Sequence, residues 1–149
     1  MQDQSLLRIK NLSVDFPVNR YQGKRGPRFK AVNDISLEVR RREILGLVGE
    51  SGAGKSLTGL ALMGLIAPPA DLNFDEMIFD DAPVTKDELA DLRGHTISMV
   101  FQDPQTSLNP LRTVGDVLVE SIQRHLSLGA EAARTRALDL LQQVGIPAA

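Results

Sequence analysis

The chain has 149 residues, 42% hydrophobic and 24% charged, so it can bury one core and is too short for two ordinary domains. Its formal net charge of -2 argues against a protein that mainly binds nucleic-acid phosphates, because such proteins usually carry a strongly basic balance. It contains no cysteine, which excludes disulfides, cysteine-ligated zinc and thiol catalysis.

No targeting or membrane-spanning segment is expected. Residues 1–11 lack the charged start, apolar middle and small-residue cleavage site of a signal peptide. The most apolar stretch, residues 57–70, is shorter than the roughly 20 residues that a bilayer-spanning helix needs. If the protein works at a membrane, a partner must hold it there.

The first third of the chain reads as strands joined by a loop. Alternating apolar and polar residues predict a strand over 7–16, and the change of phase at Asn11 indicates a bend or bulge there. Glycines and a proline predict a loop over 19–30, and alternation returns in a second strand over 35–39.

Residues 44–48 differ because they are apolar without alternation, apart from Gly46. Such a run suits a strand covered on both faces, as in a parallel α/β sheet. A glycine-rich turn follows over 49–55, and helical spacing then predicts a helix over 56–66 that Pro68 and Pro69 end.

The rest of the chain is expected to continue as short strands and helices. A short strand is expected over 77–79 before an acidic turn. Thr85 and Glu88 form a capping-box pattern for a helix that Gly94 closes. Further elements are a strand over 97–101 and helices over 114–126 and 137–144.

The turn after residue 48 matches a phosphate-binding motif. Gly49-Glu50-Ser51-Gly52-Ala53-Gly54-Lys55-Ser56 fits G-x-x-x-x-G-K-[ST] in full. Glycines let the backbone approach a polyphosphate, consecutive N–H groups cradle it, and the following helix offers its positive end. In the motif Lys55 reaches the β- and γ-phosphates and Ser56 supplies a hydroxyl to Mg²⁺. The alternative is a strand-to-helix turn that contains these residues by chance; the motif does not choose the class of NTPase.

Three stretches resemble the ABC ATPases, and within them the group serving dipeptide, oligopeptide and nickel importers. They are residues 44–56, the segment Ala31-Val32-Asn33-Asp34-Ile35-Ser36-Leu37, and Met99-Val100-Phe101-Gln102-Asp103-Pro104-Gln105-Thr106-Ser107-Leu108-Asn109-Pro110. The last is similar to the Q-loop of that group, and the resemblance runs over residues 6–147.

This resemblance implies an α/β fold, with a P-loop NTPase core of ABC type, an N-terminal antiparallel β segment and the start of a helical subdomain. We expect residues 1–149 to be a partial nucleotide-binding domain. Its core with the P-loop would span about 1–101, and the Q-loop and start of the helical subdomain about 102–149.

The resemblance also implies roles for two further residues. Gln102 would be the Q-loop residue, which contacts Mg²⁺ or a metal-bound water, in a loop that faces the permease; the alternative is an ordinary polar loop residue. Phe16 would stack on adenine, with Tyr21 and Phe29 in reserve; the alternative is a core-facing side chain at a strand end.

Other polar positions receive simpler readings. The basic residues between 20 and 30 are read as a solvated surface loop, and His95 and His125 as surface or structural residues. Arg42 and Asp81 stand where the family usually has glycine, so a positive φ would strain Arg42 in particular.

Several motifs of the family do not occur in this sequence. ABC ATPases also use an L-S-G-G-Q signature, an apolar strand ending in Asp-Glu, and a switch histidine; all should lie beyond the second predicted helix. The segments 126–130 and 77–81 resemble two of these motifs and are rejected on sequence and position. We therefore expect this chain to bind ATP without turning it over at a transporter's rate, and to expose apolar surface.

The function implied by the resemblance is that of an ATP-binding, energy-coupling subunit of an ABC importer, with ATP and Mg²⁺ as cofactors. Peptides are the cargo expected first, and nickel or other small solutes are the second choice. The expected partners are membrane permease subunits and a second ATP-binding subunit, at the cytoplasmic face of the inner membrane. The alternatives are a short non-hydrolysing ATP-binding module, a non-functional gene fragment, and another P-loop kinase.

Overall fold

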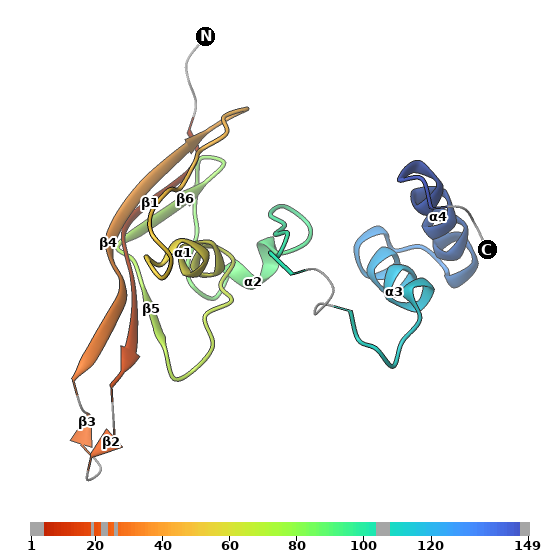
Figure 1. The fold of residues 1–149 in the computed structure, drawn as a ribbon. Helices are drawn as coiled ribbons and strands as arrows, with labels where there is room; N and C mark the ends of the chain where they lie inside the picture. Colours follow the sequence, from red (N-terminus) through yellow and green to blue (C-terminus); the bar gives the residue numbers. More distant parts are fainter. Residues whose placement is uncertain (1–4, 19, 22–23, 26, 104–107, 147–149) are drawn as a thin grey trace. The chain divides into compact units, whose positions relative to one another are not determined.

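The computed structural model describes residues 5–18, 20–21, 24–25, 27–103 and 108–146. The chain divides into two compact units, Met1–Ile97 and Ser98–Ala149. Among the described residues, the first unit contains the β-strands with two helices and the second contains a pair of helices (Figure 1). The fold is therefore mixed α/β, as expected.

The first unit is built on a five-stranded sheet whose paired strands run antiparallel. Strand β1 (Ser5–Pro17) lies between β4 (Arg28–Arg40) and β6 (Glu76–Phe79). The strands expected over 7–16, 35–39 and 77–79 are thereby confirmed, but β4 begins at Arg28, within the segment 19–30 that was expected to be a loop. The shorter strands are β5 (Asp71–Asn73), which also pairs with β1, β7 (Ala82–Pro83), which pairs with β6, and the separate pair β2 (Arg20–Tyr21) and β3 (Lys24–Arg25).

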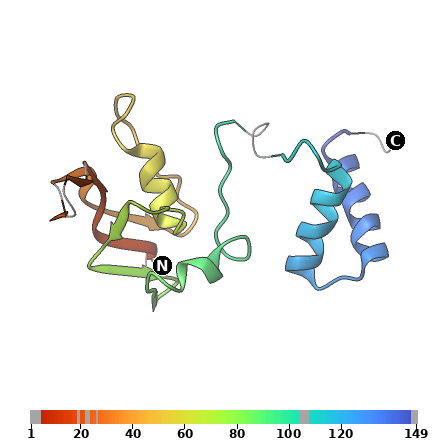
Figure 2. The ribbon, with the colours of Figure 1, turned by 90° about the horizontal axis from the view of Figure 1, so that it is seen from below.

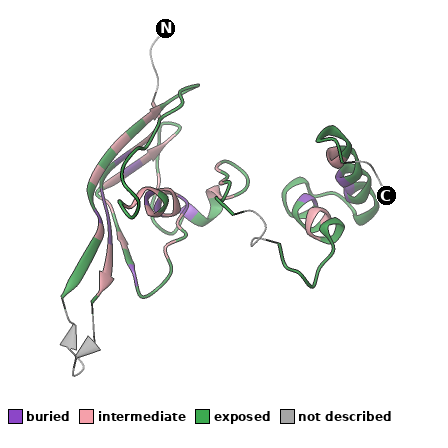
Figure 3. Ribbon diagram, viewed as in Figure 1, coloured by how far each residue is buried: buried purple, intermediate pink, exposed green. Residues whose placement is uncertain are grey.

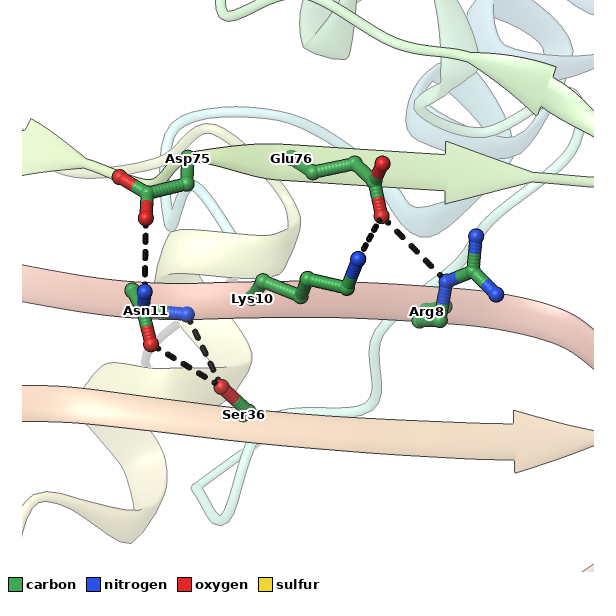
Figure 4. Close-up of polar contacts among 6 residues, drawn as sticks. All are labelled: Arg8, Lys10, Asn11, Ser36, Asp75 and Glu76. Atoms are coloured by element: carbon green, nitrogen blue, oxygen red, sulfur yellow. Dashed lines mark hydrogen bonds and ion pairs between the residues drawn. The ribbon is translucent and has the colours of Figure 1, made fainter.

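Strand β1 carries the predicted bulge at Asn11. Its φ is 54°, and the register with β4 shifts between Ile9 and Leu12. The bulge lets both of these apolar residues, three positions apart, face the core. Polar contacts to β4 and to the bend before β6 fix it: the Asn11 N–H donates to Ser36 Oγ (3.0 Å), and its side-chain amide donates to Asp75 Oδ2 (2.6 Å; Figure 4).

Helix α1 (Lys55–Leu62) covers one face of this sheet (Figure 2). Its Thr58 and Ala61 are buried, and Ala61 belongs to the cluster that joins helix and sheet. Figure 3 colours the buried positions of the ribbon purple. The short helix α2 (Leu89–Leu92) adds Leu89 to that cluster. The buried members of the cluster are Ile9, Leu12, Val14, Val32, Ala61, Ala70, Met77 and Leu89.

Helix α1 ends earlier than predicted, at Leu62, and the prolines do not end it. Gly64 has a φ of 64°; its N–H donates to the Ala61 carbonyl (3.0 Å), and the Leu65 N–H donates to the Leu60 carbonyl (2.8 Å). This is the Schellman arrangement, which closes a helix on a left-handed glycine. The local glycine therefore stops the helix before Pro68 is reached.

The two strands expected over 44–48 and 97–101 do not form. Residues 43–50 have no regular secondary structure, with Ile44 98% and Val48 90% exposed. Ile97 makes only an isolated bridge with Arg93, and Val100 is 92% exposed. An apolar run becomes a buried parallel strand only if neighbouring strands and helices cover it. Within the described residues, neither segment pairs with a strand of the sheet.

Local turn signals were predicted more accurately. The Thr85 N–H and Oγ1 both donate to Glu88 Oε2 (2.8 Å each), so the expected pair is in contact. It does not cap the helix as a capping box would, because α2 begins only at Leu89, with Glu88 at its N-cap and no side chain bonded to that end. The bonds from Thr85, the backbone one first, lower the pKa of Glu88. Arg42 and Asp81 both adopt the left-handed conformation, with φ of 62° and 64°, at positions where glycine was expected to be favoured.

The second unit contains the helices α3 (Val114–Leu126) and α4 (Ala130–Gln143). Thr113 caps α3, since its Oγ1 accepts from the Asp116 N–H (3.1 Å). The helix expected over 114–126 is confirmed, and the one expected over 137–144 begins earlier. A small core joins the pair, with Ile122, Ala133 and Ala137 buried and Leu118, Val119 and Leu140 packed against them.

In the part of the chain that the structure describes, no helix is long and apolar enough to cross a membrane.

Candidate phosphate-binding site

The predicted phosphate-binding loop lies between the exposed segment 43–48 and α1. Gly52 and Gly54 adopt left-handed φ values of 82° and 85°, which glycine reaches without steric cost. The Ala53 N–H donates to the Glu50 carbonyl (3.2 Å), which tightens the turn. Gly54 is the N-cap of α1, and no side chain caps that helix end. The first N–H groups of α1 are thus left available to a ligand.

Lys55 turns its side chain back over this loop. Its Nζ donates to the carbonyls of Gly49 (2.8 Å) and Glu50 (2.6 Å). The ammonium group therefore lies beside the turn, at the positive end of the α1 dipole. Ser56 follows as an exposed residue in the first helical turn, which contains no acidic residue. Backbone N–H groups, a cation and a helix N-terminus in one turn make an anion-binding arrangement.

Gly54 is held from both sides. A Cβ placed on it would lie 2.8 Å from the Ala31 carbonyl oxygen and 3.3 Å from Val32 Cγ2, so only glycine fits. On the helix side, the Thr58 N–H (2.8 Å) and its Oγ1 (3.0 Å) both donate to the Gly54 carbonyl. The sequence analysis assigned no part in the site to Ala31, Val32 or Thr58. The adjacent apolar pair Ala31-Val32, which breaks the alternation of β4, was the available signal.

The aromatic candidates lie on the same pair of strands. Phe16 of β1 and Phe29 of β4 are register partners. Phe16 is partly buried and packs against the core cluster, whereas Phe29 is 61% exposed. Phe16 thus packs at the edge of the core with part of its surface accessible, and its role in stacking on adenine stays a prediction. The side chain of Tyr21 lies outside the described part of the structure.

Gln102 is exposed in the coil that follows Phe101 and belongs to the second unit, so its predicted role stays a prediction. Residues 104–107 of the same motif lie outside the described residues. His95 and His125 are exposed, in keeping with a surface reading. In the described ranges, no group of three or more His, Cys, Asp or Glu side chains is arranged to hold a metal ion.

The loop residues fit a magnesium-bound triphosphate. The space beside the turn is open, since a Cβ placed on Gly52 would meet nothing within 4 Å. Lys55 offers a cation, and the Ser56 hydroxyl is an oxygen ligand of the kind that Mg²⁺ prefers. Mg²⁺ binds through few protein ligands and through phosphate oxygens, so one hydroxyl is a sufficient start for such a site.

Comparisons with known proteins identify the family of this chain. The family model for the ABC transporter matches residues 32–149. The chain is 42% identical over 146 residues to the dipeptide transport ATP-binding protein DppD of Escherichia coli (strain K12), covering 96% of this chain and 43% of that protein. It is 40% identical over 146 residues to the oligopeptide transport ATP-binding protein OppD of Bacillus subtilis (strain 168), covering 95% and 39%.

The chain therefore spans less than half the length of these curated relatives. The family match nevertheless covers most of the chain, including the phosphate-binding loop. The chain belongs to the ABC transporter family.

Proposed function

We propose that this chain provides the ATP-binding part of an energy-coupling subunit of an ABC importer. The observation that carries the proposal is Lys55, whose ammonium lies over a glycine turn at the uncapped N-terminus of α1. The whole segment from Gly49 to Ser56 would surround the phosphates of ATP. Lys55 would neutralise charge on the β- and γ-phosphates, and Ser56 would bind Mg²⁺.

The base of the nucleotide would contact the aromatic pair on β1 and β4. The exposed ring of Phe29 offers a stacking surface, and Phe16 supports it from the core side while offering its own accessible part. Stacking on an aromatic ring contributes about 1–3 kcal/mol per base in single-strand nucleic-acid sites. Because every base has a flat face, this contact would add affinity and discriminate poorly among bases.

Peptides are the proposed cargo, because the relatives are named as dipeptide and oligopeptide transport proteins. We infer that membrane permease subunits and a second ATP-binding subunit are the partners and that the protein is peripheral at the cytoplasmic face of the inner membrane. Gln102 would contact Mg²⁺ or its water, in a loop that meets the permease. This sequence contains no L-S-G-G-Q signature, so we expect nucleotide binding by this chain without turnover at a transporter's rate.

Binding of ATP with Mg²⁺, measured by isothermal titration calorimetry, tests the proposal. Lys55→Ala removes charge-assisted hydrogen bonds to the phosphates and should raise the Kd roughly 10- to 100-fold. Lys86→Ala is the matched control, because it removes an exposed lysine of the same unit that contacts Asn73 (3.0 Å) and the Phe74 ring. Equal affinities of the wild type and Lys55→Ala would overturn the proposal.

A second titration separates the role of the metal. Ser56→Ala should remove most of the difference between ATP affinity with Mg²⁺ and with a chelator, while leaving metal-free binding nearly unchanged. An unchanged effect of Mg²⁺ in Ser56→Ala would exclude this hydroxyl as the metal ligand.

A further inference from the structure

Strand β4 carries a bulge at Ala31, next to the phosphate-binding loop. Val32 pairs with Val14 of β1, but the next pair along the strands is Lys30 with Asp15. One residue on β1 therefore advances while two advance on β4, and Ala31 has no register partner. Bulges of this kind occur next to active sites, where they redirect the backbone.

The bulge lies directly under the end of the phosphate-binding loop. The Ala31 carbonyl oxygen and Val32 Cγ2 occupy the space where a side chain of Gly54 would stand, at 2.8 Å and 3.3 Å. In contrast, a Cβ on Gly52, in the middle of the loop, would meet nothing within 4 Å. The loop is thus supported against the sheet at the residue immediately before Lys55.

We propose that Ala31 and Val32 are positioning residues for the phosphate-binding loop. They fix Gly54 against the sheet, while Thr58 fixes its carbonyl from the helix side (2.8 Å and 3.0 Å). Gly54 in turn sets the direction in which α1 begins, and with it the N–H groups and the Lys55 side chain that meet the phosphates. This inference rests on the proposed function and extends it to two residues outside the motif.

The chain offers a matched pair of variants for the test. Val32 and Val14 are the same residue type, face each other across β1 and β4, and are 2% and 0% exposed in the same core cluster. Of these two side chains, only Val32 is in the immediate surroundings of Gly54. Val32→Ala and Val14→Ala each remove the same two methyl groups from the core, so both should destabilise the unit to a similar extent.

Pyrophosphate with Mg²⁺, which lacks a base and sugar, is the probe for the loop itself. We expect Val32→Ala to raise its Kd about tenfold, because a small displacement of a positioned group has a large effect. Val14→Ala should change that Kd less than about twofold, because Val14, unlike Val32, is not among the nearest neighbours of a Cβ placed on Gly54. Equal changes of Kd in the two variants would show that Val32 acts only as a core residue, and would overturn the inference.

Hydrogen exchange of the chain without ligand gives a second readout. Exchange of the amides in residues 54–58 should be faster in Val32→Ala than in Val14→Ala at equal global stability. If the wild type bound no pyrophosphate, the proposed function would fail, and this comparison would still decide the inference. If the alanine variants do not fold, Val32→Ile and Val14→Ile, which add one methyl group each, repeat the test. If these two variants differed neither in the Kd of pyrophosphate nor in hydrogen exchange of residues 54–58, the inference would be overturned.

Discussion

Gly64→Ala is expected to destabilise the first unit more than the replacement of a left-handed glycine by alanine normally does. Gly64 has a φ of 64°, so any other residue is strained there. In addition, a Cβ on Gly64 would lie 2.8 Å from Cβ of Leu89, which is buried in the core. Gly145 ends α4 in the same Schellman arrangement, with a φ of 79°, but a Cβ there would meet nothing within 4 Å. The pair therefore separates backbone strain from overpacking.

The two contributions can be estimated separately. A left-handed alanine costs about 1–2 kcal/mol, which is the whole effect expected for Gly145→Ala. Forcing an extra methyl group into a packed core costs about 1–3 kcal/mol more. The free energy of unfolding of the first unit should therefore fall by about 2–5 kcal/mol in Gly64→Ala.

Native-state hydrogen exchange under increasing urea measures this effect for each unit by itself. The slowest amides near Ile9 and Leu12 report the first unit, and those near Ile122 and Ala133 report the second, because these residues lie in the respective cores. Equal losses of stability in the two variants would refute the packing of Gly64 against Leu89. A stabilised Gly64→Ala variant would refute the left-handed conformation as well.

Three further predictions concern turns and chemistry. Arg42→Gly should stabilise the first unit by about 0.5–1 kcal/mol in thermal denaturation, because it removes a strained side chain at φ 62°. Asp81→Gly should stabilise the unit less, since Asp tolerates this conformation better. A larger stabilisation by Asp81→Gly than by Arg42→Gly would contradict the strain argument. Hydrogen bonds from Thr85 lower the pKa of Glu88, so the stability that they contribute is present above the ordinary value of 4.5 and is lost as the pH falls through the lowered pKa. Melting temperatures from neutral to acid pH should show this loss in the wild type and less of it in Glu88→Gln; identical profiles would exclude the contact. Steady-state phosphate release from ATP should not exceed that of Lys55→Ala, and clearly higher release by the wild type would show that this chain can orient a water without the missing motifs.

The sequence predicted the elements whose causes are local. Alternation identified the antiparallel strands, and its change of phase located the bulge at Asn11, because strand faces follow from a period of two. The contact between Thr85 and Glu88 was predicted for the same reason, since it depends on a few neighbouring residues. The positive φ of Arg42 was anticipated only as a condition, from the resemblance to a family that usually has glycine there. The early end of α1 was missed because the prolines were preferred to the closer signal, Gly64.

Features that depend on distant contacts were not predicted. The apolar runs 44–48 and 97–101 match buried strands in composition, but strand formation requires hydrogen-bonding neighbours that composition cannot supply. In the candidate site, the motif identified Lys55 and Ser56 together with the glycine turn. The support of Gly54 by Ala31 and Val32 depends on the pairing of β1 with β4. The broken alternation at this pair signals an irregularity in β4 but does not say what the pair contacts.

The exposure of residues 44–48 also has a consequence for the behaviour of the protein in solution. The segment reads Ile-Leu-Gly-Leu-Val, carries no charge and has both ends almost fully exposed. Exposed apolar segments of this kind promote association between copies of a protein. A concentrated sample should therefore associate through this stretch, and Leu45→Lys should oppose that association. Because Gly49 follows at once, such association would bring the phosphate-binding loops of neighbouring copies close to the contact.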